Sequence, residues 1–174
     1  MKRLFMMAFM TIIATVAFAA NPLKVVNGDK KFFKNAEGTV FLEVIYDENA
    51  TFDDKMPLTE KYDNMEEKTT ISYNGFIEEF SERNNKLQFV KTEEEATYKI
   101  TIRVTKVDEF INVMGFIPGP CIRVWGTFTV TDAKSGETLL VVDIDEIDGG
   151  SAPTTDRAFN DTFGKLGEKI AKLK

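Results

Sequence analysis

Histidine is absent from this chain of 174 residues, and cysteine occurs only once, at Cys121. Without an imidazole, neither Ser–His–Asp nor Cys–His catalysis can operate, and no zinc site can use a His ligand. A lone Cys cannot form a disulfide within the chain, so the fold must depend on the burial of apolar side chains. We expect Cys121 to be a buried, unreactive thiol; a reactive or intermolecular thiol is the alternative.

Long hydrophobic runs are missing from most of the chain, which makes the one at its start informative. Two basic residues precede an apolar run over residues 4–18, and Ala17-Phe18-Ala19 has the small residues that signal peptidase requires. The run is shorter than the ~20 residues that span a bilayer. We therefore predict a signal peptide over residues 1–19, cleaved near Ala19. Position 20 is Ala rather than Cys, so we expect a periplasmic or secreted, soluble product with no stable membrane anchor.

Positive charge is scarce relative to negative charge. The chain has 22 Lys and Arg residues against 28 Asp and Glu, a net charge of −6 at pH 7. Lys2 and Arg3 belong to the predicted signal peptide, so the remaining 155 residues carry 20 basic and 28 acidic side chains, a net charge of −8. Nucleic acids and anionic lipids are bound by clustered Lys and Arg. We therefore expect no nucleic-acid partner, and an unidentified envelope or secreted protein instead.

Alternation of apolar and polar residues predicts the strands. Tyr98, Ile100, Ile102 and Val104 alternate with polar residues, which is typical of an antiparallel strand with one solvated face. The same pattern predicts a second such strand after residue 121, and a polar turn at residues 132–137 leads into a return strand. In all, we predict a short β-like piece at Leu23–Val26 and strands near residues 40–46, 87–90, 97–105, 122–131 and 139–147.

Two segments have the apolar spacing of amphipathic helices. The first runs from about Met65 to Arg83, where Gly75 indicates close packing, and the second begins near Thr155 or Asp156. We therefore predict an N-terminal arm over residues 20–38 and a single α+β domain over residues 39–174. Its expected architecture is a mainly antiparallel, four- to five-stranded sheet with both helices packed on one face.

The motifs of common catalytic and metal sites fail one by one. The acidic run at residues 143–150 lacks the Gly and the final Glu of a calcium loop, and no Ser is followed by Lys three residues later. Gly164-Lys165 is followed by Leu166, where a phosphate loop needs Ser or Thr. We therefore predict no catalytic residue, no metal site and no cofactor. A pair of carboxylates acting on a glycan is the enzymatic alternative.

The segment over residues 110–120 is unusual for a hairpin tip, because it is long, apolar and contains two prolines. It could fold back over a sheet edge, or it could present an apolar surface to a partner. Trp125 lies on an otherwise polar strand face, where it is either a second contact residue or buried under Phe32 and Phe33. Our candidate partner-binding residues are Met114, Phe116, Ile117 and Trp125.

The layout from about Thr39 to Leu173 resembles small, uncharacterised exported proteins of Gram-negative bacteria. It is similar to the β-α-β-β-β-α periplasmic domains of penicillin-binding-protein activators and curli-secretion lipoproteins. The residues that carry the resemblance are the strand Tyr98–Val104, Trp125-Gly126-Thr127-Phe128 with the following turn, and the last helix. The resemblance implies a fold but transfers no functional residue.

These observations favour an exported accessory or binding domain that acts through protein contacts in the cell envelope. The alternative is an envelope enzyme that acts on glycan through a carboxylate pair. We therefore favour a binding protein over an enzyme.

Overall fold

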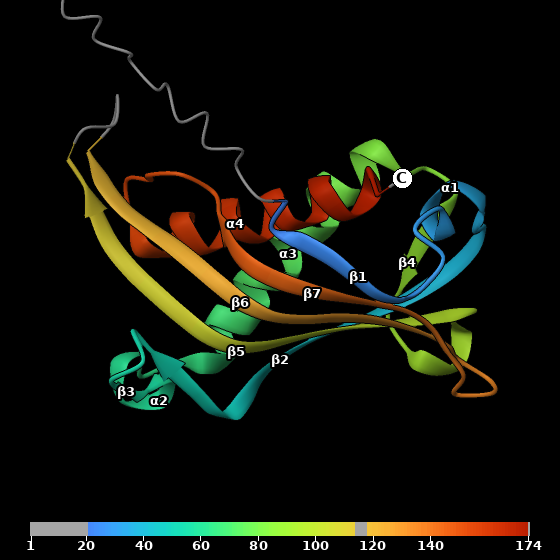
Figure 1. Ribbon diagram of the computed structural model, residues 1–174, viewed down its shortest axis with the longest axis horizontal. Helices are drawn as coiled ribbons and strands as arrows, with labels where there is room; N and C mark the ends of the chain where they lie inside the picture. Colours follow the sequence, from blue (N-terminus) through green and yellow to red (C-terminus); the bar gives the residue numbers. More distant parts are fainter. Residues whose placement is uncertain (1–20, 114–117, 174) are drawn as a thin grey trace, which may run out of the picture.

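The computed structural model describes residues 21–113 and 118–173 (Figure 1). The predicted signal peptide over residues 1–19 lies outside these residues. Seven strands form one sheet in the order β1-β7-β6-β5-β2-β3, with β4 paired to β2. The strands are β1 (Leu23–Gly28), β2 (Gly38–Phe52), β3 (Met56–Pro57), β4 (Leu87–Val90), β5 (Tyr98–Asn112), β6 (Gly119–Asp132) and β7 (Thr138–Asp148).

The α+β class is confirmed, but the predicted sheet of four to five mainly antiparallel strands was wrong in size and direction. The sheet is mixed, because β2 runs parallel to both β4 and β5. Two parallel neighbours need a crossover connection, and the segment containing the long helix α3 (Met65–Arg83) supplies it between β2 and β4. Alternation predicts that a segment is a strand but not the direction of its partner. It also misses β3, which has only two residues.

The two long helices, α3 and α4 (Thr155–Ala171), lie side by side over one face of the sheet, as predicted (Figure 1). The side chain of Asn64 accepts a hydrogen bond from the backbone N–H of Glu67 and so caps α3. Thr154 caps α4 in the same way. The remaining helical elements are short: α1 (Phe32–Asn35), α2 (Leu58–Lys61) and the 3₁₀ turn η1 (Glu93–Glu95).

Glycines set the close approach of α3 and α4. A Cβ at Gly75 would lie 2.3 Å from the carbonyl oxygen of Asn160, and a Cβ at Gly167 would lie 2.5 Å from that of Phe76. The predicted close packing at Gly75 is thereby confirmed. The two helix axes can approach only because these positions carry no side chain.

Phenylalanine rings fill the space between the helices and the sheet. The largest fully buried rings are those of Phe33, Phe76, Phe80, Phe128, Phe159 and Phe163. Phe33 comes from the N-terminal segment, and its ring packs edge-on against Phe80 and Phe128 at centroid distances of 5.4 and 5.9 Å. The same segment contributes β1, which pairs with β7 at the sheet edge. Residues 23–35 therefore share the sheet and the core, and they bring their lysines to the ends of α3 and α4.

Candidate functional site

Three of the four predicted contact residues, Met114, Phe116 and Ile117, lie outside the described residues. Next to them, Ile111 and Val113 are 61% and 73% exposed at the tip of the β5–β6 hairpin. Their exposure is compatible with the predicted apolar surface, which stays a prediction.

Trp125 is half-buried in β6 and lies on the sheet face away from the helices. Phe128 packs on the helix side, and residues three apart in a strand point to opposite faces. Trp125 is therefore not buried under Phe32 and Phe33, and that alternative was wrong. The ammonium of Lys106 lies 4.6 Å from the centroid of the indole ring. A Lys-capped ring is a plausible contact residue, and its partner-binding role stays a prediction.

Cys121, near the start of β6, is buried, as predicted. Burial raises the pKa of its thiol, so the protonated, unreactive form is favoured. Its pairing partner Phe110 stacks with Arg123, whose guanidinium carbon lies 4.1 Å from the ring centroid. The Nε atom of Arg123 lies 3.2 Å from a carboxylate oxygen of Glu146. The burial of the thiol and its raised pKa indicate a structural role for it.

A carboxyl group whose pKa is raised would be the first sign of the enzymatic alternative. Among the described carboxyls, only that of Asp161 has a raised pKa, with burial as the main cause, and Nε of Arg157 lies 2.8 Å from it. Glu168, whose pKa is lowered to about 2 by hydrogen bonds from Lys165 and Lys172, lies two helical turns farther along α4. Two turns are about 10 Å, whereas glycoside hydrolysis uses carboxyls about 5–9.5 Å apart. That rise separates the backbone positions rather than the carboxyl oxygens, so the enzymatic alternative stays a prediction.

Glu109 is a second carboxylate to weigh, because its side chain is largely buried between β5, α2 and α4. Tyr62 and Thr155 donate hydrogen bonds of 3.1 and 2.9 Å to its two oxygens, and the ammonium of Lys61 lies 3.5 Å away. Each carboxylate oxygen therefore has a partner, and the side chain links β5, α2 and α4. Buried polar groups with all partners present are typical of a structural contact.

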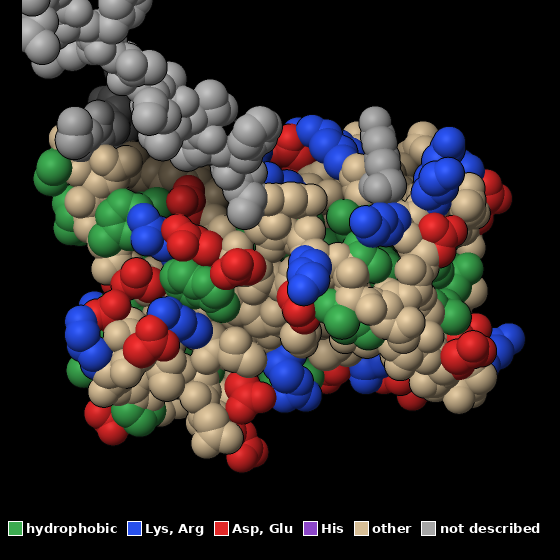
Figure 2. Space-filling model, in the orientation of Figure 1, with side chains coloured by type: hydrophobic (Ala, Val, Ile, Leu, Met, Phe, Trp, Pro, Cys, Tyr) green, Lys and Arg blue, Asp and Glu red, His purple; other side chains and the backbone are tan. Residues whose placement is uncertain are grey.

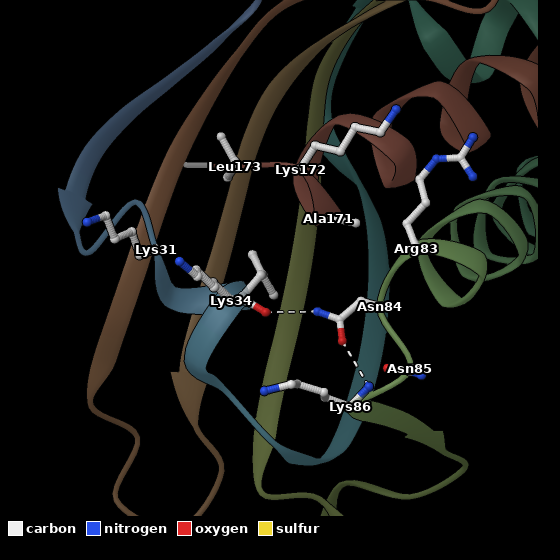
Figure 3. Close-up of a pocket in the computed structure, with 10 residues that line it drawn as sticks. Lys31, Lys34, Arg83, Asn84, Asn85, Lys86, Ala171, Lys172 and Leu173 are labelled. Carbon is white, nitrogen blue, oxygen red and sulfur yellow. Dashed lines mark hydrogen bonds between the residues drawn. The ribbon is translucent and has the colours of Figure 1, made fainter.

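The strongest candidate site is an open hollow of about 600 Å³ where α1 meets the C-terminal ends of α3 and α4. Figure 3 shows its lining, and Figure 2 shows Lys and Arg side chains gathered over α1 and the end of α4. Among the residues that the structure describes, none that lines this hollow carries a carboxylate. We call it the basic hollow, and its cationic residues are Lys31, Lys34, Arg83, Lys86 and Lys172.

A buried amide fixes the wall of the basic hollow. Asn84, only 7% exposed, follows α3 directly. Its Nδ2 donates to the carbonyl oxygen of Phe33 at 3.0 Å, and its Oδ1 accepts from the backbone N–H of Lys86 at 3.1 Å (Figure 3). One side chain thereby ties α1 to the end of α3 and holds lysines of both segments around one space.

The cations of the hollow differ in their pairing. Arg83 and Lys172 have nitrogens 3.8 and 2.6 Å from the Glu168 carboxylate, and Figure 3 shows their head groups turned away from the lysines opposite. Lys86 pairs with Glu37 at 2.9 Å. Within the part of the chain that the structure describes, Lys31 and Lys34 form no ion pair. Both side chains are exposed, so their ammonium groups are accessible to an anion.

The sequence analysis did not predict this site, because the net charge of a chain does not show which charged residues lie close together in the fold. The cations come from three segments separated by about 50 and 80 residues, and only folding brings them together. Two local signals existed: the Lys30-Lys31-Phe32-Phe33-Lys34 run and the lysines of the last helical turn. Cations at helix C-termini also interact favourably with the helix dipole. This explains Arg83 and Lys172, and it applies to Lys34 in the last turn of the four-residue helix α1, but it does not explain Lys31, which precedes α1.

Within residues 21–113 and 118–173, no group of three or more Cys, Asp and Glu residues is placed to hold a metal ion. Among the same residues, no helix is both long enough and apolar enough to cross a membrane.

Comparisons with known proteins give only distant structural likenesses. No protein-family model and no curated protein matches the sequence. The chain is similar to the PelC dodecamer from Paraburkholderia phytofirmans, with 12% identity over 87% of this chain and 98% of that chain and a TM-score of 0.47. It is also similar to a neuraminyllactose-binding hemagglutinin homologue from Helicobacter pylori, with 14% identity, 79% and 85% coverage and a TM-score of 0.38.

A third bacterial structure, protein XCC0632 from Xanthomonas campestris with the family designation DUF330, has 10% identity, 78% and 82% coverage and a TM-score of 0.39. All three TM-scores are below 0.5, so these likenesses carry no argument about what this chain binds. The resemblance to activators of penicillin-binding proteins and curli-secretion lipoproteins stays a prediction.

Proposed function

We propose that this chain is an exported binding protein that holds an anionic ligand in the basic hollow. The observation that carries the proposal is that the described residues lining one open space include five cations and no carboxylate, in a chain of net charge −6. Lys31 and Lys34 lack an ion pair among the described residues, so they are available to a ligand.

Like charges gathered in one place oppose folding. Two ammonium groups about 8 Å apart repel by about 0.5 kcal/mol in water, and several such pairs add up before salt screens them. The chain has 28 Asp and Glu residues, and a carboxylate between these cations would reduce their repulsion. A bound anion removes the repulsion, which is a physical reason for the hollow to take one up.

The basic hollow has the size of a ligand site rather than of a single ion pair. Ligand sites in proteins enclose about 300–1,000 Å³, and the hollow falls in this range at about 600 Å³. Asn84 holds its wall in place before any ligand arrives, so little ordering is needed on binding.

The test is calorimetric titration of residues 20–174 with inorganic tripolyphosphate at two salt concentrations. We expect binding that weakens as salt rises, and a loss of about tenfold or more in the double variant K31E/K34E, since each lysine contributes a charge-assisted contact. The matched control is K91E/K134E, which changes the net charge equally at exposed lysines outside the hollow. Equal losses in both variants, or no binding at all, would contradict the proposal.

A further inference from the structure

A second hollow adjoins the basic hollow across the end of α4. It has a volume of about 710 Å³, and Lys172 and Leu173 line both hollows. Its other cations are Lys24 and Lys30, from β1 and the turn after it, and Lys169 of α4. Within residues 21–113 and 118–173, no carboxylate lines it and none of these three lysines forms an ion pair. The two hollows together form one band with eight cations: Lys24, Lys30, Lys31, Lys34, Arg83, Lys86, Lys169 and Lys172.

We infer that the ligand is an acidic polysaccharide that lies across both hollows, an inference that rests on the proposed function. A chain with a negative charge on successive sugars would meet Lys31 and Lys34 in the first hollow and pass over Lys172 at the end of α4. It would then meet Lys30 in the second hollow. Both hollows are open, so a chain can enter and leave without threading.

The kind of cation favours a chain of repeated charges over one small anion. Seven of the eight are lysines, which act as point charges without the fork geometry that fixes a single carboxylate or phosphate. The one arginine, Arg83, already has its guanidinium near Glu79 and Glu168. Charge spread along a band with little geometric definition suits a ligand whose charges repeat.

Aromatic residues distinguish a polysaccharide from a nucleic acid. Proteins that bind single-stranded nucleic acids offer exposed aromatic faces on which bases stack. Phe33 is the one aromatic among the residues lining the two hollows, and it is 2% exposed. The hollows instead carry the side chains of Asn21 and Asn85, whose amides can bond sugar hydroxyls. A concave band also fits a chain better than the flat surface of a bilayer.

The test compares oligogalacturonates of two, four and eight sugars as probes, because they carry one carboxylate per sugar. If the chain spans both hollows, affinity should rise at least tenfold from the disaccharide to the octamer, since the second hollow then acts at a high effective concentration. The double variant K30E/K169E should lose most of that gain and keep its affinity for tripolyphosphate within about twofold. K31E/K34E should lose affinity for every probe, and K91E/K134E for none.

The outcomes separate this inference from the proposed function. Equal affinity for all three lengths, with tripolyphosphate still bound in the basic hollow, overturns the polysaccharide and leaves the proposed function standing. Tighter binding of an oligothymidylate of equal charge than of the octamer also overturns it. If no probe binds, both fail. The single variant K30E serves if K30E/K169E is less than fully folded by circular dichroism, and it should lose part of the octamer's advantage.

Discussion

The basic hollow and the groove between α3 and α4 share Arg83 but treat charge in opposite ways. The groove, about 290 Å³, has charges of both signs: Glu78, Glu79, Asp161 and Glu168 with Arg83, Arg157 and Lys165. Here Arg157 pairs with Asp161, Lys165 with Glu168, and Arg83 with Glu79. Among the described residues that line the basic hollow, all charged side chains are cations, and Lys31 and Lys34 form no ion pair. The comparison teaches that the cations of the groove have carboxylate partners on their own helix, whereas the basic hollow has two cations without such a partner among the described residues.

Gly75 tests the structural half of this comparison and has the largest expected effect. G75A should lower the free energy of unfolding by about 3 kcal/mol, because the added methyl would lie 2.3 Å from the carbonyl oxygen of Asn160 and force the helices apart. The control is G164A, whose methyl would lie 3.1 Å from the flexible side chain of Glu79 and 3.4 Å from the carbonyl oxygen of Gly75, without a severe backbone clash. Urea denaturation measures both. Equal stability of the two variants would show that the groove is not a tight contact.

Asn84 tests whether the hollow is held in shape. N84A should cost about 2 kcal/mol of stability, because the backbone oxygen of Phe33 and the N–H of Lys86 lose their partner. It should also weaken tripolyphosphate binding several-fold, since the lysines of α1 and of residue 86 are no longer held around one space. The control variant is N85A at the exposed neighbouring residue, and its free energy of unfolding should stay within about 0.5 kcal/mol of the wild-type value. Unchanged affinity in folded N84A would show that the wall has no part in binding.

Glu168 tests the boundary between the two regions, because it pairs with both Arg83 and Lys172 of the hollow. In E168Q these cations are released, so we expect tripolyphosphate to bind about two- to threefold more tightly at pH 7. A loss of affinity would contradict the view that Glu168 competes with the ligand. Glu78 lines the same groove but lines neither hollow, so E78Q is the control variant.

The acid side of the stability profile should also depend on Glu168. Hydrogen bonds from Lys165 and Lys172 lower its pKa to about 2 from an ordinary value of 4.5. A depressed pKa stabilises the folded state above the unfolded-state pKa, and this contribution disappears as the pH falls from about 4.5 to 2. Wild-type and E168Q stabilities should therefore converge over that range in thermal melts. A constant difference from pH 7 to pH 2 would contradict the assigned pKa.

Trp125 has the smallest expected effect on binding. It lies on the opposite face of the sheet from the helices and is the only Trp in the chain, so its fluorescence reports on that face alone. Tripolyphosphate should leave its emission unchanged, and W125F should bind the anion as the wild type does. If Trp125 contacts a partner protein, as the sequence predicts, W125F should instead weaken capture of that protein from native envelope. A large emission change with tripolyphosphate would place an anion site on the wrong face.

Local chemistry is why much of the fold could be predicted. The apolar spacing of α3 predicted its bounds, since a half-buried helix must repeat apolar residues at its own period. The alternation in β5 predicted the start of this strand but not its end, because β5 continues to Asn112, beyond the predicted residue 105. The parallel pairing of β2 with β5 could not be predicted in this way, because it depends on where the chain crosses the sheet after β2. The β1 strand likewise gains its partner, β7, from the far end of the sequence.

The candidate site was less predictable than the fold, because it depends on contacts between segments that are far apart in the sequence. Lys31, Lys86 and Lys172 are unremarkable in their own segments, and an acidic composition argued against a basic site. Composition averages over the surface, whereas a ligand experiences the local field. Trp125 was found because an aromatic on a polar strand face stands out in the sequence, and a cluster assembled from distant segments does not.

The most direct test of the basic hollow is a two-dimensional amide NMR titration of residues 20–174 with tripolyphosphate. We predict saturable shifts at residues 31–34, 84–86 and 171–173, which surround the hollow, and none beyond the salt control at residues 104–106 and 123–127 around Trp125. Shifts that centre on Trp125, or that spread evenly over all exposed lysines without saturating, would contradict the account.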